Sequence, residues 1–232
     1  MKKSISIIVP AYNEEANLER AVKKYNLLAK ELFDDHEIII FNDCSTDQTG
    51  RIADSLAKKN PRIRVIHNKT NMGLGYNFRK GVELAKKTYF TVMFGEGDML
   101  TSSARNILKS AGKADIIMSY VQNPEARTWI RRIISSSFTK TLNLLFGLKL
   151  KYYNGYTVHK TKLIKKTHLT TNSFAYQAEA LIRLLKKGHS YLQVPFLTAK
   201  TSGSSMFRLK NLVGIGKTVL RLFWEVRIKR EV

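Results

Sequence analysis

Short apolar runs alternate with amphipathic stretches along the first hundred residues. Residues 4–9 (Ser-Ile-Ser-Ile-Ile-Val) are nearly all apolar and rich in β-branched side chains, which is typical of a buried strand in a parallel sheet. From Glu14 to Leu32, apolar residues recur at helical spacing and acids stand in the first turn, where the helix dipole favours them. The same patterns predict strands over 37–41, 63–67 and 89–94, a helix that ends near Lys59 and a helix over 73–87.

The βαβαβαβ order predicts an α/β fold with a mostly parallel sheet, helices on both faces and ligands at the carboxyl ends of the strands. After residue 100 the pattern is weaker. It predicts helices over 102–111, 127–146 and 174–187, strands over 115–120, 152–159 and 191–195, and a final basic helix. No repeat or linker divides the chain. We expect a main domain over residues 1–205 and an amphipathic helix over 206–232 that belongs to the same unit.

Positive charge is concentrated in the second part of the chain. The protein has 40 Lys and Arg against 18 Asp and Glu, a net charge of +22. Residues 1–100 hold 16 basic and 13 acidic residues, a balance of +3, whereas residues 101–232 hold 24 and 5, a balance of +19. The expected partner is a polyanion, either anionic lipid or nucleic acid. No zinc spacing, RNA-binding aromatic signature or compelling helix-turn-helix pattern accompanies the charge, so no nucleic acid is expected.

Cysteine usage and hydropathy bear on the compartment. Cys44 is the one cysteine, which excludes an internal disulfide framework and fits the reducing cytoplasm. The apolar run after Lys3 is too short for a signal peptide, and no window approaches the ~18 apolar residues of a membrane span. We therefore expect a cytoplasmic protein that, if it meets a membrane, lies on the cytoplasmic face as a peripheral protein.

Three polar clusters directly follow expected strands. They are Pro10-Ala11-Tyr12-Asn13-Glu14, Asn42-Asp43-Cys44-Ser45-Thr46-Asp47 and Gly95-Glu96-Gly97-Asp98. Because an open α/β sheet has its binding crevice at the carboxyl ends of its strands, the three clusters are expected to share one crevice.

These clusters closely resemble the family 2 glycosyltransferases. The resemblance rests on Ile-Val-Pro-Ala-Tyr-Asn-Glu-Glu, Asn-Asp-Cys-Ser-Thr-Asp-Gln-Thr, Asn-Met-Gly-Leu-Gly and the acidic pair after an apolar strand. It is strong over residues 4–100 and looser to about residue 205. Within the family, the chain looks most like the dolichyl- or polyprenyl-phosphate mannosyl- and glucosyltransferases. The resemblance implies a GT-A-like fold, a nucleotide-sugar donor and a lipid-phosphate acceptor.

The resemblance also implies roles for the donor-side residues. Pro10, Ala11, Tyr12 and Glu14 would line the nucleotide pocket, and Asp43 would accept a hydrogen bond from the base.

Glu96 and Asp98 correspond to the DxD motif of the family, in which two carboxylates one residue apart approach one cation. Mg²⁺ or Mn²⁺ is implied, because hard oxygen ligands together with diphosphate oxygens suit these ions. The cation would neutralise charge on the departing nucleoside diphosphate, which gives Asp98 a catalytic role. The usual first aspartate is Glu96 here, with a side chain one methylene longer. An inactive family member therefore stays an alternative.

The acceptor side has few acids and many cations. Gln177 and Glu179 resemble the Gln-x-Glu element of the branch and are catalytic candidates, with Glu179 as the base if the acceptor is a sugar hydroxyl. A phosphate acceptor is already ionised and needs cations rather than a base. The expected acceptor or phosphate contacts are Arg127, Arg131, Asn154, Lys200, Ser204 and Arg208.

Two basic amphipathic helices are expected to bind an anionic membrane surface, with core packing as the alternative for each. The apolar stripe of the first comprises Ile130, Ile133, Ile134, Phe138, Leu142 and Leu145. In the second, Leu209, Leu212, Val213, Leu220, Phe223 and Trp224 lie opposite Lys210, Lys217 and Arg221. The sugar, the nucleotide base and the oligomeric state are left open. The competing functions are sugar transfer to a glycan hydroxyl and nucleic-acid binding.

Overall fold

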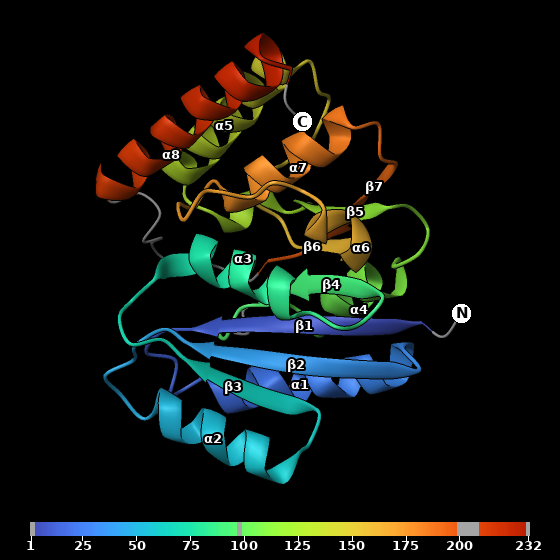
Figure 1. Cartoon of the computed structure of the whole chain (residues 1–232), viewed down its shortest axis with the longest axis vertical. Coiled ribbons are helices and arrows are strands. Elements are labelled where there is room, and N and C mark those ends of the chain that lie inside the picture. The colour runs from blue at the N-terminus through green and yellow to red at the C-terminus, as the bar shows by residue number, and fades with distance from the viewer. Residues whose placement is uncertain (1–2, 97–98, 199–208, 231–232) are drawn as a thin grey trace.

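The computed structural model describes residues 3–96, 99–198 and 209–230. Its strands are β1 (Ser4–Ala11), β2 (Asp35–Asn42), β3 (Ile63–His67), β4 (Tyr89–Val92), β5 (Ile116–Val121), β6 (Thr157–Lys160) and β7 (Tyr191–Phe196). They form one sheet in the order β3-β2-β1-β4-β6-β5-β7 (Figure 1). Strand β6 is antiparallel to β4 and β5, and the other neighbouring pairs are parallel. The prediction of a mostly parallel sheet is confirmed.

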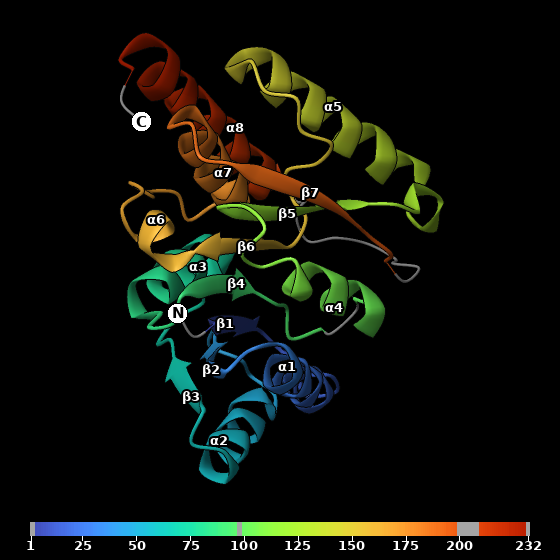
Figure 2. The same ribbon diagram turned by 90° about the vertical axis from the view of Figure 1, so that its right-hand side faces the viewer.

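Helices cover both faces of the sheet (Figure 2). One face carries α1 (Leu18–Leu32), α2 (Thr49–Lys59) and α4 (Thr101–Lys109). The other carries α3 (Gly73–Leu84), α5 (Trp129–Phe146), α6 (Thr161–Lys165), α7 (Tyr176–Lys186) and α8 (Leu209–Phe223). A 3₁₀ turn η1 (Pro124–Ala126) precedes α5, and a π-helical segment η3 (Trp224–Ile228) continues α8. The short helix α6 was not anticipated from the sequence.

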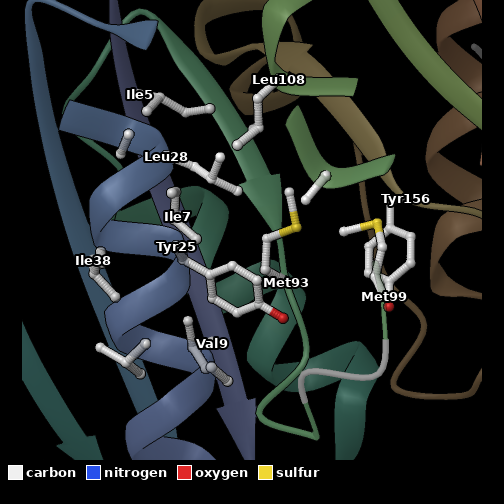
Figure 3. Packing of buried hydrophobic residues seen from close by; sticks show 14 of the residues in the cluster. Ile5, Ile7, Val9, Tyr25, Leu28, Ile38, Met93, Met99, Leu108 and Tyr156 are labelled. Atoms are coloured by element: carbon white, nitrogen blue, oxygen red, sulfur yellow. The ribbon is translucent and has the colours of Figure 1, made fainter. Parts of the chain in front are cut away.

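The alternation of side chains along β1 builds a core on each face, since successive residues of a strand point to opposite sides. Ile5, Ile7 and Val9 pack with Tyr25 and the rest of α1 (Figure 3). Ile8 belongs to the opposite core, which includes α3 and α7. All of these side chains are fully buried, as a central strand covered on both faces requires.

Helix α3 ends three residues before the boundary that its pattern predicts. The backbone N–H of Lys86 donates to Oε1 of Glu37 at 2.7 Å, and the N–H of Lys87 donates to Oγ of Ser6 at 3.1 Å. Both acceptors are buried in the sheet. These bonds replace the helical hydrogen bonds of the last predicted turn, so the chain leaves the helix after Leu84.

Helices α5 and α8 lie side by side at the end of the molecule opposite α2 (Figures 1 and 2), with the rings of Phe146 and Phe223 6.5 Å apart. Leu142, predicted for the apolar membrane stripe of α5, is fully buried, because it faces the core together with Phe146. The assignment of Leu142 to a membrane stripe is therefore wrong. Arg221, predicted for the polar face of the last helix, pairs with the buried Glu179 and the half-buried Glu225. No helix in the described part of the chain combines the length and apolarity that crossing a bilayer requires.

Candidate active site

Loops from three strands meet at the edge of the sheet where β1, β2 and β4 end, on the left in Figure 1. The backbone N–H of Asp43 donates to the carbonyl of Ala11 at 2.9 Å, and that of Gly95 donates to the carbonyl of Pro10 at 3.3 Å. The carboxyl end of β1 is therefore bonded to the segments that follow its two neighbouring strands. The structure thus brings the first two polar clusters together with Gly95 and Glu96 of the third.

Side chains fasten the loop after β1 to the loop after β2. Asn13 has a left-handed backbone, with φ of 56°, and its Oδ1 accepts the N–H of Thr46 at 2.9 Å. The N–H of Asn13 donates to Oγ of Ser45 at 3.1 Å. Further along, Oε2 of Glu15 accepts the N–H of Gln48 at 2.9 Å. These bonds within the protein fix the two loops relative to each other, and such preorganisation lowers the cost of binding a ligand.

The carboxylate of Asp47 bonds both loops. Its Oδ1 accepts the N–H of Thr49 at 2.9 Å, at the start of α2, and its Oδ2 accepts the N–H of Glu15 at 3.2 Å. Burial opposes ionisation of Asp47, but hydrogen bonds from Thr49 and Glu15 outweigh it and hold the pKa of this carboxyl below its ordinary value. Asp47 therefore acts as a charged anchor of the loop rather than as a proton donor.

The carboxylate of Asp43 anchors the start of α3. Its Oδ1 accepts the N–H of Met72 at 2.8 Å and Nδ2 of Asn68 at 2.7 Å, while Oδ2 accepts the N–H of Gly73 at 2.9 Å. Gly73 has φ of 81°, a left-handed conformation that favours glycine. Asp43 is buried, yet a carboxylate offers about four acceptor positions, so one stays available to a ligand. Base recognition by Asp43 stays a prediction.

The residues predicted to line the nucleotide pocket differ in exposure. Pro10 and Ala11 are buried at the end of β1, whereas Tyr12, in the loop that follows, is 50% exposed. Glu14 is half-buried, and its Oε2 accepts Nδ2 of Asn17 at 3.3 Å. The exposed ring of Tyr12 is suited to stacking on a nucleobase.

Close packing of Gly95 places Glu96 beside the first loop. A methyl group on Gly95 would lie 3.3 Å from Cβ of Ala11 and 3.5 Å from Cγ of Glu14. The exposed Glu96 follows directly, and Asp98 lies outside the described residues. Within the described ranges, no three His, Cys, Asp or Glu side chains form a cation site on their own. Carboxylate oxygens nevertheless fit Mg²⁺ or Mn²⁺, for which the diphosphate oxygens of a donor would complete the ligand set.

The candidate acceptor residues lie at the same edge, where β5 and β7 end and β6 begins. Arg127 donates from Nη1 to the hydroxyl of Tyr152 at 3.0 Å, and its guanidinium lies 5.2 Å from the centre of that ring. Arg131 is half-buried in the first turn of α5. Three further predicted contacts, Lys200, Ser204 and Arg208, lie outside the described residues.

Gln177 holds the segment that contains Asn154. From α7, its buried side chain donates through Nε2 to the carbonyl of Gly155. A methyl group on Gly155 would lie 2.0 Å from the carbonyl oxygen of Ser119 in β5, so glycine is required for this approach. The half-buried Asn154 is thereby fixed at the amino end of β6. The structure gives Gln177 a positioning contact, and its catalytic role stays a prediction.

Glu179 lies in a buried ionic network. Its side chain is 1% exposed, and it accepts hydrogen bonds from the backbone of Thr170 at 3.1 Å and of Thr171 at 3.0 Å. Nη2 of Arg221 donates to it at 3.1 Å, and the buried Arg183 is 3.7 Å away. With its oxygens taken by these donors, Glu179 links α7 to α8. Its predicted role as a base is untested.

Comparison with known proteins relates these loops to one family. Residues 6–94 match the sequence profile of "Glycosyl transferase family 2". This range runs from β1 to the end of β4 and includes the first two polar clusters. The segment from β1 to β4 belongs to glycosyltransferase family 2.

Relatives and solved structures extend the likeness beyond the matched range. The polyprenol monophosphomannose synthase of Mycolicibacterium smegmatis is 26% identical over 86% of this chain and 82% of its own length. The uncharacterized glycosyltransferase EpsJ of Bacillus subtilis is 30% identical over 71% of this chain, which spans half of that relative. The glucosyl-3-phosphoglycerate synthase of Mycobacterium tuberculosis, solved with Mn²⁺, UDP and product, superposes with a TM-score of 0.68 at 16% identity, over 96% of this chain and 79% of that one. The GT-A-like fold is confirmed.

Asn68 also belongs to this site, although it was not predicted from the sequence. Its Nδ2 donates to Asp43 and, at 2.8 Å, to Oδ1 of the fully buried Asn77 of α3. Asn68 directly follows β3, so the rule that finds the other clusters, a polar residue just past a strand end, could have found it. Asn77 carried no such signal, because an asparagine within an amphipathic pattern is usually exposed.

Proposed function

We propose that the protein transfers a hexose from a UDP- or GDP-linked sugar to a polyprenyl or dolichyl phosphate. The similarity to the polyprenol monophosphomannose synthase along most of both chains supports this acceptor class. The site supports it through one observation above all. Glu179, the acid in the element that resembles the Gln-x-Glu motif, is fully engaged by Arg221 and by two backbone donors. A phosphate acceptor is the chemistry that needs no base from this position.

The donor would bind over the preorganised loops. The ring of Tyr12 and the remaining acceptor position of Asp43 suit the nucleoside. Glu96 and Asp98 would hold Mg²⁺ or Mn²⁺, which would supply neutralisation of the charge on the departing diphosphate. Half-buried cations at the same edge, Arg127 and Arg131, would hold the acceptor phosphate in line.

The reaction would be a single displacement with inversion at the anomeric carbon. A phosphate oxygen of the acceptor forms the new bond to the anomeric carbon. At the same time, the bond between this carbon and the diphosphate oxygen of the donor breaks. The bonding electron pair leaves with the nucleoside diphosphate. Arg127 is positioned for the acceptor by its hydrogen bond to Tyr152 rather than by an acid, which keeps its charge available to an anion.

A glycan hydroxyl acceptor is the second candidate, and one residue favours it. Glu125 is an exposed acid in η1, two residues before Arg127 and at the same edge of the sheet. Such a carboxylate could serve a hydroxyl acceptor as a general base, a contribution of roughly 10²- to 10⁴-fold in rate. Glu125→Gln should leave transfer to a polyprenyl phosphate unchanged and should reduce transfer to a hydroxyl by that factor.

The working place is proposed to be the cytoplasmic face of an anionic membrane, where a lipid acceptor resides. The assay uses a panel of radiolabelled UDP- and GDP-sugars with polyprenyl phosphate dispersed in detergent, and the unphosphorylated polyprenol is the matched control. Label in the lipid fraction with the phosphate and none with the alcohol supports the proposal. Label that enters only added glycan acceptors contradicts it.

A further inference from the structure

Helices α5 and α8, with the π-helical segment η3, expose apolar side chains at one end of the molecule. We call this surface the α5/α8 face. It comprises Trp129, Ile130, Ile133, Ile134 and Leu144 of α5 together with Leu212, Val213, Leu220, Trp224 and Ile228 of α8 and η3. Trp129 is 68% exposed, Leu220 73% and Trp224 57%. Side chains this large and this exposed on two adjacent helices are unusual on a soluble surface and indicate an interaction site.

Core packing does not account for these residues. The same helices face the core with other side chains, among which Leu142, Phe146 and Leu222 are fully buried. Val226 and Phe223 complete this inner side. Each helix therefore carries two apolar sides, one that stabilises the fold and one that is left to solvent.

The charges of this region are unbalanced once the buried network is considered. Arg183 and Arg221 pair with Glu179 and Glu225, so these four charges sum to zero. Glu225 is the one acid between residues 209 and 230, and α5 has none. Arg227 and Arg230 are exposed at the end of this region, so positive charge predominates there.

A groove of about 560 Å³ opens beside the α5/α8 face, where α7 and η3 end. Its apolar lining residues include Phe223 and Val226, and its three charged lining residues, Lys186, Arg227 and Arg230, are all cations. Ile228 belongs to both surfaces, since it lines the groove and is 53% exposed on the face. A lining that combines apolar side chains with cations matches the chemistry of a phosphate group that carries a hydrocarbon chain.

We propose that the α5/α8 face docks on an anionic bilayer and that the groove binds the phosphate headgroup of an anionic phospholipid. Trp224 and Ile228 then enter the boundary between headgroups and acyl chains, as the apolar side of an interfacial helix does. The inference rests on the proposed function, because a lipid acceptor is reached at a membrane. Docking itself does not require sugar transfer.

The groove is distinct from the acceptor site. Helix α5 begins two residues after Arg127 and contacts Phe223, at the groove, through Phe146 in its last turn. Its 18 residues span about 27 Å at 1.5 Å per residue. A headgroup in the groove and an acceptor phosphate at Arg127 are therefore two different molecules, and the first would hold the protein on the bilayer while the second reacts.

The test is flotation of the full chain with vesicles of phosphatidylcholine, with and without phosphatidylglycerol. The groove variant combines Lys186→Gln, Arg227→Gln and Arg230→Gln. The matched control removes the same charge at the opposite end of the molecule through Arg51→Gln, Lys58→Gln and Lys59→Gln on the exposed surface of α2. Because each cation near an anionic surface contributes on the order of 1 kcal/mol, the groove variant should lose about 100-fold in partition to the anionic vesicles, and the control far less.

Fluorescence locates the contact independently of charge. Trp129→Phe leaves Trp224 as the one tryptophan, which should be quenched by brominated acyl chains if η3 enters the bilayer. Equal partition losses in the groove variant and the α2 control, or an unquenched Trp224, would overturn the proposal. Binding of glycerol phosphate to the groove by a protein that does not bind vesicles would also overturn it, because the groove would then be a site for soluble phosphates. Preferential binding of the protein to duplex DNA would overturn it as well.

Transfer in detergent separates this inference from the proposed function. The groove variant should keep wild-type transfer to detergent-dispersed polyprenyl phosphate, since none of its three residues lies at the carboxyl edge. Vesicle binding by a wild type that transfers no sugar would leave docking intact and remove the proposed function. Sugar transfer in detergent by a wild-type protein that binds no vesicles would support the proposed function and contradict membrane docking.

Discussion

Asp43 is the residue at which the proposed donor binding and the stability of the fold are most directly connected. Asp43→Ala removes the acceptor for the N–H groups of Met72 and Gly73 and for Asn68. Hydrogen bonds to a charged group contribute roughly 1.5–3 kcal/mol each, but Met72 and Gly73 are only half-buried, so water can replace part of the loss. We expect the free energy of unfolding to fall by about 2–4 kcal/mol. Asp43→Asn keeps the volume and one oxygen, so it should lose about half as much.

The same substitution should weaken binding of the nucleoside diphosphate. One lost hydrogen bond to a carboxylate corresponds to about 1.5–3 kcal/mol, or roughly a 10- to 150-fold rise in Kd. Urea unfolding gives the stability, and calorimetry with UDP and GDP, below the unfolding transition, gives the affinity. Asp54→Ala is the control. Its carboxylate is 62% exposed and pairs with His67 at 2.9 Å, so its removal should cost at most about 1 kcal/mol and leave Kd unchanged.

The two measurements can refute the reasoning separately. An Asp43→Ala protein with the urea midpoint and slope of the wild type would show that the three bonds do not stabilise the start of α3. A destabilised Asp43→Ala protein with an unchanged Kd for both nucleotides would show that Asp43 supports the loop and does not read the nucleotide.

Three further predictions concern other parts of the molecule. Asp98→Ala should abolish transfer with an unchanged unfolding midpoint, and a variant that keeps wild-type turnover in chelator would remove the metal role. Gly155→Ala should destabilise by roughly 2 kcal/mol or more in thermal melts, because its methyl would lie 2.0 Å from a backbone oxygen of β5, whereas Gly216→Ala, with nothing within 4 Å, should be neutral or stabilising. Hydrogen bonds from Lys160 and a serine lower the pKa of Asp115 from 3.8 to about 2. The stability that Asp115 adds over Asp115→Asn in urea unfolding should thus be constant above about pH 4 and shrink as the pH falls towards 2; a constant difference would contradict this.

The amino-acid sequence by itself determined the α/β framework. Buried parallel strands appear in a sequence as unbroken runs of β-branched residues, so the positions of β1 and β3 could be predicted. Strand β3 has the predicted bounds Ile63–His67. The meeting of the loops after β1, β2 and β4 also followed from the sequence, because parallel strands end at a shared edge. The family followed from the residues of those loops.

The tertiary structure decided which polar residues are free to act. Sequence placed Gln177 and Glu179 on a helix, but only the fold shows that nearly all of α7 is buried and that Glu179 is engaged by Arg221. The antiparallel strand β6, which fixes Asn154 at the site, also came from long-range pairing that no local pattern specifies.

The same distinction holds for the helices of the α5/α8 face. Helical periodicity identifies apolar positions, but a helix with two apolar sides gives no sign of which one meets the core. Packing decided that Leu142 and Leu222 are buried, while Trp129 and Trp224 are exposed. The physical reason is that burial depends on what lies opposite a side chain, and a one-dimensional pattern records only the side chain itself.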